Sequence, residues 1–229
     1  RRIREEVRDA CLAPGERLCA PLLVDARGDV LRWAPQWGWV WFDGKRWRRV
    51  EDEEVERRAT GVVRDIYREA SEGLTPDRRG EISKWAKSSE TKAQISAMVS
   101  LSKGFLIKSV DSFDQCAFLF NVANGTIPLV TQKIRPHDPQ DYLTKVAPVV
   151  FDSAAQCPQW EAFLERIFRS DPAIIKYLQT VIGYALTSSA NEQMAIILYG
   201  LGENGKTTFI ETAMALFGVG EYSVQTSFE

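Results

Sequence analysis

The sequence of 229 residues contains no apolar run close to the roughly 18 residues that a membrane-spanning helix requires, so we expect no membrane association. It has one histidine, His137, and four cysteines without a Cys-x-x-Cys pair, which argues against a zinc site of clustered thiolate and imidazole ligands. The formal net charge of −2 gives no overall attraction to nucleic acid. The lack of a cysteine framework and of an apolar leader predicts an intracellular, cytoplasmic protein.

A tryptophan-rich stretch between residues 39 and 50 predicts a β-hairpin. The pair Asp43-Gly44 favours a two-residue turn, which would place Trp41 opposite Arg46 and Trp39 opposite Arg48. These four side chains would then share one face of the sheet. Aromatic rings alternating with arginines can stack bases and pair with phosphates, so the face is a candidate site for single-stranded DNA. The same pairs also occur as ordinary stable sheet surfaces, and this alternative stays open.

Helical and extended patterns alternate along the rest of the chain. Apolar residues spaced by three and four predict helices over 51–70 and 91–101. A second hairpin is expected from 117–122 and 126–130, turning at Asn124-Gly125. Prolines 158 and 172 suit first helical turns, and they predict a helical hairpin over 158–186 whose Trp160, Phe163 and Ile167 would be core residues.

The chemistry-bearing motif is a glycine-rich loop, residues 200–207, that reads Gly-Leu-Gly-Glu-Asn-Gly-Lys-Thr. An apolar run over 194–199 predicts a buried strand before it, and 208–217 predicts a helix after it, which is the context of a Walker A loop. We expect Lys206 and Thr207 to act on the β- and γ-phosphates of ATP and on Mg²⁺, with Thr207 as the metal ligand. The predicted nucleotide-binding residues are Gly200, Leu201, Gly202, Glu203, Asn204, Gly205, Lys206, Thr207 and Thr208.

Hydrolysis of ATP requires more than this loop. It needs an acidic residue on a second strand for magnesium and water, and an arginine from the same or another chain. After residue 217 the only acidic residues are Glu221 and Glu229, and no apolar strand ends in an acidic pair. We therefore expect this stretch alone to be inactive as an ATPase.

A second polar cluster, His137 with Asp138 and Asp141, is a candidate metal or acid–base site. Pro136 and Pro139 flank it, and this spacing favours a turn.

From Trp39 onward the chain resembles the phage and plasmid primase-helicase family, whose superfamily 3 helicase module also occurs in poxvirus and phage-satellite replication proteins. The likeness rests on the Walker loop and on several short motifs. These motifs read WFDGKRW at 41–47, NVANGTI at 121–127, RPHDP at 135–139, DYLTK at 141–145, CPQW at 157–160, YLQ at 177–179 and GYAL at 183–186.

This resemblance implies an α/β protein in which an α+β helicase-associated domain precedes the start of an AAA+-like P-loop ATPase domain. The corresponding segments would be a linker over 1–32, the associated domain over 33–157, a helical connector over 158–190 and the truncated ATPase domain over 191–229. It also implies an ATP-dependent DNA helicase that acts on single-stranded or origin DNA as a homo-oligomeric ring, a hexamer in the full-length form. The family's Walker B segment, sensor and arginine finger have no counterpart in this stretch, and neither does a primase active site.

Two other functions fit parts of the pattern. The stretch could be a non-catalytic DNA-binding or partner-docking module of a replication protein. A small-molecule or nucleoside kinase would use the same loop, but it requires acceptor and lid elements after the helix, and the long preceding domain argues against it.

Overall fold

The computed structural model describes residues 20–71, 80, 83–84, 87–189, 191–193 and 195–227, so the first 19 residues of the predicted linker lie outside the described residues. The chain divides into two compact units. Unit 1 comprises the described residues up to Asp43 together with Trp47–Ser112, and unit 2 comprises Gly44–Arg46 together with the described residues from Phe113 onward. Each unit is described by itself.

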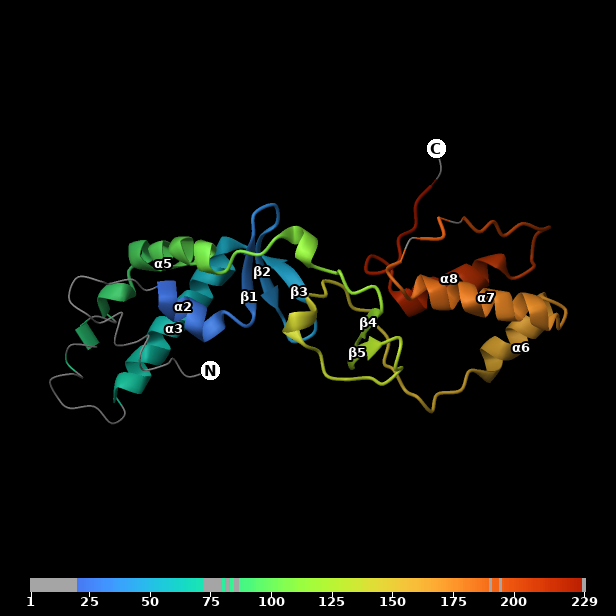
Figure 1. The fold of residues 1–229 in the computed structure, drawn as a ribbon, viewed down its shortest axis with the longest axis horizontal. Helices are drawn as coiled ribbons and strands as arrows, with labels where there is room; N and C mark the ends of the chain where they lie inside the picture. The colour runs from blue at the N-terminus through green and yellow to red at the C-terminus, as the bar shows by residue number, and fades with distance from the viewer. Residues whose placement is uncertain are drawn as a thin grey trace. The chain divides into compact units, whose positions relative to one another are not determined.

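The described part of unit 1 combines a small antiparallel sheet with several helices (Figure 1). The strands β1, β2 and β3 lie side by side in the order of the sequence, and both neighbouring pairs are antiparallel. The elements are α2 (Ala20–Arg27), β1 (Leu31–Ala34), β2 (Gly38–Phe42), β3 (Trp47–Val50), α3 (Asp52–Ser71) and α5 (Lys92–Phe105).

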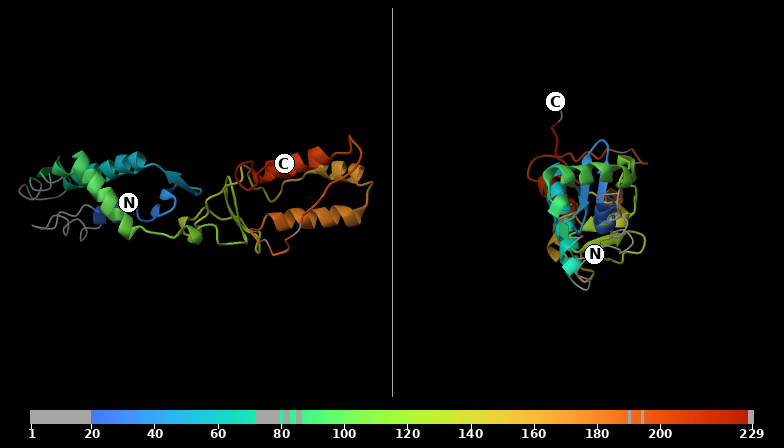
Figure 2. Two further views of the ribbon diagram at one scale, coloured as in Figure 1. Left: turned by 90° about the horizontal axis from the view of Figure 1, so that it is seen from above. Right: turned by 90° about the vertical axis from the view of Figure 1, so that its left-hand side faces the viewer.

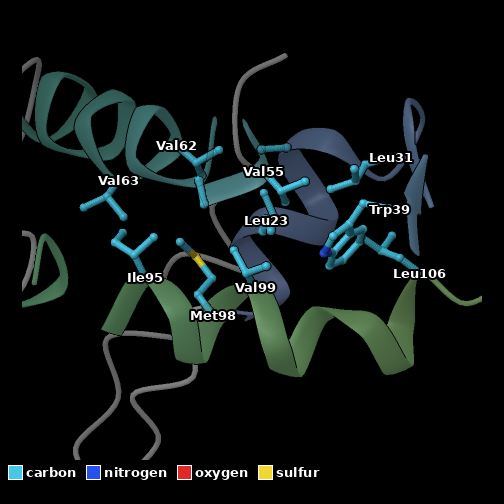
Figure 3. Packing of buried hydrophobic residues seen from close by; sticks show 12 residues of the cluster. Leu23, Leu31, Trp39, Val55, Val62, Val63, Ile95, Met98, Val99 and Leu106 are labelled. Atoms are coloured by element: carbon cyan, nitrogen blue, oxygen red, sulfur yellow. The ribbon is translucent and has the colours of Figure 1, made fainter. Parts of the chain in front are cut away.

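The core of unit 1 lies where α2, α3 and α5 meet the sheet. Helix α3 buries Val55, Ala59, Val62 and Val63, which is the spacing of one helical face, and its first turn carries acidic residues that suit the positive end of the helix dipole. Figure 3 shows these valines facing side chains of α5 and α2, with Trp39 of the sheet inside the same cluster. The predicted helices over 51–70 and 91–101 are therefore confirmed as α3 and α5.

Residues 20–32 are not a linker. Leu23 and Ala26 of α2 lie in the core, and Leu31 of β1 is buried beside them. The sequence offers little apolar periodicity here, because a short helix that contacts its neighbours on several sides needs no single apolar stripe.

The first hairpin forms, but its predicted register is wrong by two residues. Phe42 pairs with Trp47 and Trp41 with Arg48, so residues 43–46 form a four-residue loop in place of the expected two-residue turn. The Phe42 and Trp47 rings contact each other, with centroids 5.9 Å apart. A shift of two residues keeps every side chain on its face, so the Trp39 and Trp41 face persists, with Arg48 and Val50 opposite them.

The described residues of unit 2 form one two-stranded hairpin and three α-helices, and two further views of the chain are given in Figure 2. The hairpin pairs Val122 with Gly125, so its turn is Ala123-Asn124, one residue before the predicted one. Helices α6 and α7 form within the segment predicted as a helical hairpin, and their pairing as a hairpin stays a prediction. Asp171 caps α7 by accepting hydrogen bonds from the Ala173 and Ile174 amides. The elements are β4 (Leu119–Val122), β5 (Gly125–Pro128), α6 (Pro158–Ile167), α7 (Pro172–Ala185) and α8 (Lys206–Phe217), with short 3-10 turns at Val110–Ser112 in unit 1 and Pro139–Asp141 in unit 2.

The core of unit 2 is built on the β4–β5 hairpin. Phe120, Val122 and Ile127 are buried there with Ala147, and Phe217 of α8 joins them. The ends of α7 and α8 pack against this cluster. In α6 the predicted core residues Trp160, Phe163 and Ile167 are only half-buried, because α8 and the glycine loop contact this helix on one side only.

The strand predicted over 194–199 is not present in its described part, residues 195–199. This segment joins α7 to α8 as an extended trace, and no described strand pairs with it (Figures 1 and 2). Ile197 is 82% exposed and Tyr199 is 90% exposed. An apolar run forms a buried strand only when a neighbouring strand takes up its backbone hydrogen bonds, so the local pattern alone was insufficient.

The described structure is thus a mixed fold of helices and small antiparallel sheets, which fits the predicted α+β domain. The parallel sheet of a P-loop ATPase stays a prediction for 191–229. None of the described helices is both long and apolar enough to cross a membrane.

Candidate phosphate-binding loop

The glycine-rich loop ends at the first residue of α8. Helix α8 begins at Lys206, and Gly205 before it takes a left-handed backbone conformation with φ of 82°. The Lys206 ammonium donates hydrogen bonds to the Gly200 carbonyl at 3.0 Å and to the Asn204 side-chain oxygen at 2.7 Å, with the Leu201 carbonyl at 3.4 Å. The lysine therefore lies within the curve of its own loop and is half-buried.

Two glycines of the loop occupy places that a side chain would obstruct. A Cβ on Gly205 would lie 2.8 Å from Ile167 Cγ2 and 3.1 Å from the Phe163 ring, so α6 packs directly against the loop here. A Cβ on Gly200 would collide with the Asn204 amide. The positive φ of both residues independently favours glycine.

The loop has the chemical groups that an anion requires. The first amides of a twelve-residue helix lack intrahelical partners, and the helix dipole adds positive potential at this end. Lys206 adds a full positive charge, and the exposed Thr207 and Thr208 supply hydroxyl oxygens. A triphosphate and a hard cation such as Mg²⁺ match this set of donors and acceptors.

Helix α6 supports α8 behind the loop. The Trp160 ring stacks on Phe209 of α8, with centroids 5.6 Å apart and an interplanar angle of 21°, and on Phe163 at 5.4 Å. Phe209 is buried. The sequence predicted an apolar stripe on α6 but not this contact, because the two helices lie about 50 residues apart in the chain.

The four residues of the expected DNA-binding face are not brought together as a stacking surface. Trp39 is 1% exposed, and a buried ring cannot stack on a base. The Arg58 guanidinium covers Trp41, 3.9 Å from the ring centroid. Arg46 lies in the hairpin loop and pairs with Glu221, while Arg48 lies 3.8 Å from Asp43.

His137, Asp138 and Asp141 have separate roles. The Asp138 carboxylate caps the 3-10 turn by accepting from the Gln140 amide, and Asp141 pairs with Arg135 at 2.7 Å. This hydrogen bond to Asp141 raises the pKa of the Arg135 guanidinium. In the part of the chain that the structure describes, no group of three His, Cys, Asp or Glu side chains is placed to hold a metal ion.

A polar network that the sequence did not reveal surrounds Asn121, a fully buried residue of β4. Its amide nitrogen donates to the Lys45 and Lys145 carbonyls at 2.9 and 2.8 Å, and its oxygen lies 2.9 Å from His137 Nδ1. The Tyr222 hydroxyl accepts from the Asn121 backbone amide at 3.3 Å. Burial raises the pKa of Tyr222 above its usual range. The network joins segments that only the fold brings together.

Comparison with known proteins assigns the chain to a family. Residues 20–169 match the family described as D5 N terminal like. No curated protein matches the chain. The match covers 150 of the 229 residues, including all of the sheet of unit 1, the β4–β5 hairpin and helix α6. The chain therefore belongs to the D5 N terminal like family, the N-terminal domain of the D5-type primase-helicase proteins of phages, plasmids and viruses.

Proposed function

We propose that residues 200–208 bind ATP with Mg²⁺ and that the chain forms part of a replication helicase. In this proposal Lys206 pairs with the β- and γ-phosphates, and Thr207 supplies an oxygen to the metal. The backbone amides at the start of α8 hold the remaining phosphate oxygens. The bound nucleotide would supply the phosphoanhydride bond whose hydrolysis drives a motor.

The placement of the Lys206 ammonium carries this proposal. Long lysine side chains on a protein surface normally extend into water, whereas this one folds into the loop and donates to Gly200 and Asn204. Those acceptors are neutral, so an arriving phosphate would exchange them for stronger charge-assisted hydrogen bonds. Gly200 leaves room for the Asn204 amide that accepts from the lysine, and this supports the same function.

The wider activity is proposed from family membership. The D5 N terminal like match supports a primase-helicase context, and we propose ATP-dependent action on single-stranded or origin DNA by a homo-oligomeric ring, a hexamer in the full-length form. Hydrolysis would then use an acidic residue and an arginine beyond those of the loop. The expected DNA affinity depends steeply on salt, because binding releases counterions from phosphates, and a salt titration with labelled single-stranded DNA measures it.

The first test is the substitution Lys206→Ala. We expect it to reduce affinity for a fluorescent ATP analogue by about 100-fold, since the charged partner of two phosphates is lost. Lys176→Ala is the matched control, because Lys176 is an exposed lysine on α7 of the same unit and lies outside the loop. Equal nucleotide affinity in wild type and Lys206→Ala would contradict the proposal that residues 200–208 bind the nucleotide.

A further inference from the structure

We propose that the groove between α6 and α8 receives the base and ribose of the nucleotide whose phosphates bind at residues 200–208. The inference rests on the proposed function and extends it from a phosphate site to a nucleoside site. The groove has a volume of about 640 Å³. This lies within the roughly 300–1,000 Å³ of typical small-ligand pockets.

The groove adjoins the loop through two residues. Thr208 lines it from α8 and is also the last residue of the proposed phosphate site, so the two sites share a residue. Phe163 lines it from α6, and the same ring lies 3.1 Å from where a Cβ on Gly205 would stand. Thr212, one helical turn beyond Thr208, extends the groove along α8 away from the phosphates.

The walls match a nucleobase in chemistry. Trp160 lines the groove, and its stacking on Phe209 and Phe163 fixes the ring before any ligand arrives. Because the ring is already fixed by these two contacts, little entropy is lost to ordering of the protein when a ligand meets this apolar wall.

The polar groups of the groove are neutral. Gln156 and Gln159 provide amides that can donate to and accept from base edges, and Thr208 and Thr212 provide hydroxyl oxygens for a ribose. None of the described residues that line the groove is charged, whereas Lys206 lies in the loop. This division of charge matches a nucleotide, which has a neutral nucleoside at one end and an anionic chain at the other.

The experiment compares ATP with inorganic tripolyphosphate, which shares the phosphate chain but lacks base and ribose. Both compete against a fluorescent ATP analogue on the full chain. Thr212→Trp fills the groove from an exposed helix position, and Ala215→Trp adds the same bulk at an exposed position of α8 outside the groove. We expect Thr212→Trp to weaken ATP by about tenfold or more and to leave tripolyphosphate unchanged, and Ala215→Trp to change neither.

A second readout uses the two described cysteines. Cys157 lines the groove and Cys116 does not, and both thiols are exposed. We expect ATP to slow alkylation of Cys157 by at least about fivefold while tripolyphosphate does not, with Cys116 unaffected by either ligand. Peptide mass spectrometry after brief alkylation separates the sites.

The outcomes distinguish the two levels of the proposal. Binding of tripolyphosphate and ATP with equal affinity, or an unchanged ATP affinity in Thr212→Trp, would overturn the groove and leave the phosphate loop standing. Absence of binding by both compounds to the wild-type chain would overturn the loop and the groove together. Alkylation of Cys157 at the same rate with and without bound ATP would also reject the groove.

Discussion

Among single residues, Trp39 is one of the largest fully buried side chains of unit 1, and its indole N–H has no hydrogen-bond partner among the described residues. The ring fills the space between Leu31 and Leu106 (Figure 3). Trp39→Ala should lower the free energy of unfolding by about 3–5 kcal/mol, because a large cavity opens. Trp39→Phe should cost about 1 kcal/mol, because most apolar volume stays and a buried unpaired donor is removed. Urea denaturation measures the free energy of unfolding of both variants. An equal decrease in Trp39→Ala and Trp39→Phe would show that the ring does not fill the core.

Gly205 is the second residue whose environment dictates its identity. Gly205→Ala should lower the stability of unit 2 by about 1–3 kcal/mol, because φ is 82° and the new methyl group meets Ile167 and Phe163. Gly202→Ala is the matched control from the same loop, since no atom lies within 4 Å of its Cβ position and its φ is not positive. Thermal and urea unfolding of the pair provide the measurement. An identical loss of stability in Gly205→Ala and Gly202→Ala would contradict the close approach of α6 to the loop.

At the level of elements, the turn after α8 is anchored to the β4–β5 hairpin through Tyr222. Its hydroxyl donates to the Lys145 carbonyl and accepts from the Asn121 amide, and burial raises its pKa. Because the folded pKa exceeds the unfolded value of about 10, this contribution to stability is complete below about pH 10 and declines as the pH rises above it. The free energy of unfolding of the wild type should exceed that of Tyr222→Phe by about 1 kcal/mol at pH 8, and this difference should shrink by pH 11. Urea titrations at both pH values measure it, and a constant difference would contradict the assignment.

The elements also show how far the sequence predicts the fold. Helix α3 was predictable because its apolar spacing is a local property, and the loop at Lys206 because all its residues are contiguous. The register of β2 and β3 was not predictable, because Arg46 in their loop pairs with Glu221, 175 residues away. The extended residues 195–199 failed as a strand for a related reason, since a strand depends on a neighbour that the local pattern does not contain. The Asn121 network likewise joins segments that are distant in the sequence, so no local motif predicts it.

For the whole molecule, the family match and the compact units have different boundaries. Residues 20–169 include unit 1 and the first part of unit 2, and they end between α6 and α7. Helix α8 lies beyond the match, yet Phe217 packs in the same cluster as Phe120 of β4. The family domain and helix α8, whose first turn belongs to the candidate phosphate site, therefore share one hydrophobic core within unit 2.

This shared core predicts different behaviour for the two sheets when the chain is shortened to residue 169. The β4–β5 hairpin would lose the cover of Ile182, Leu186 and Phe217, and a two-stranded hairpin without such cover is marginally stable in water. Its backbone amides should exchange with solvent at least about 100-fold faster than in the full chain, because the free energy required for local unfolding decreases. Strand β1, whose buried Leu31 belongs to a described core that ends at Leu106, serves as the internal control, and its exchange should be unchanged. Amide exchange followed by mass spectrometry on both chains measures this, and full protection of β4–β5 in the shortened chain would show that the hairpin is stable without the helices that adjoin the candidate site.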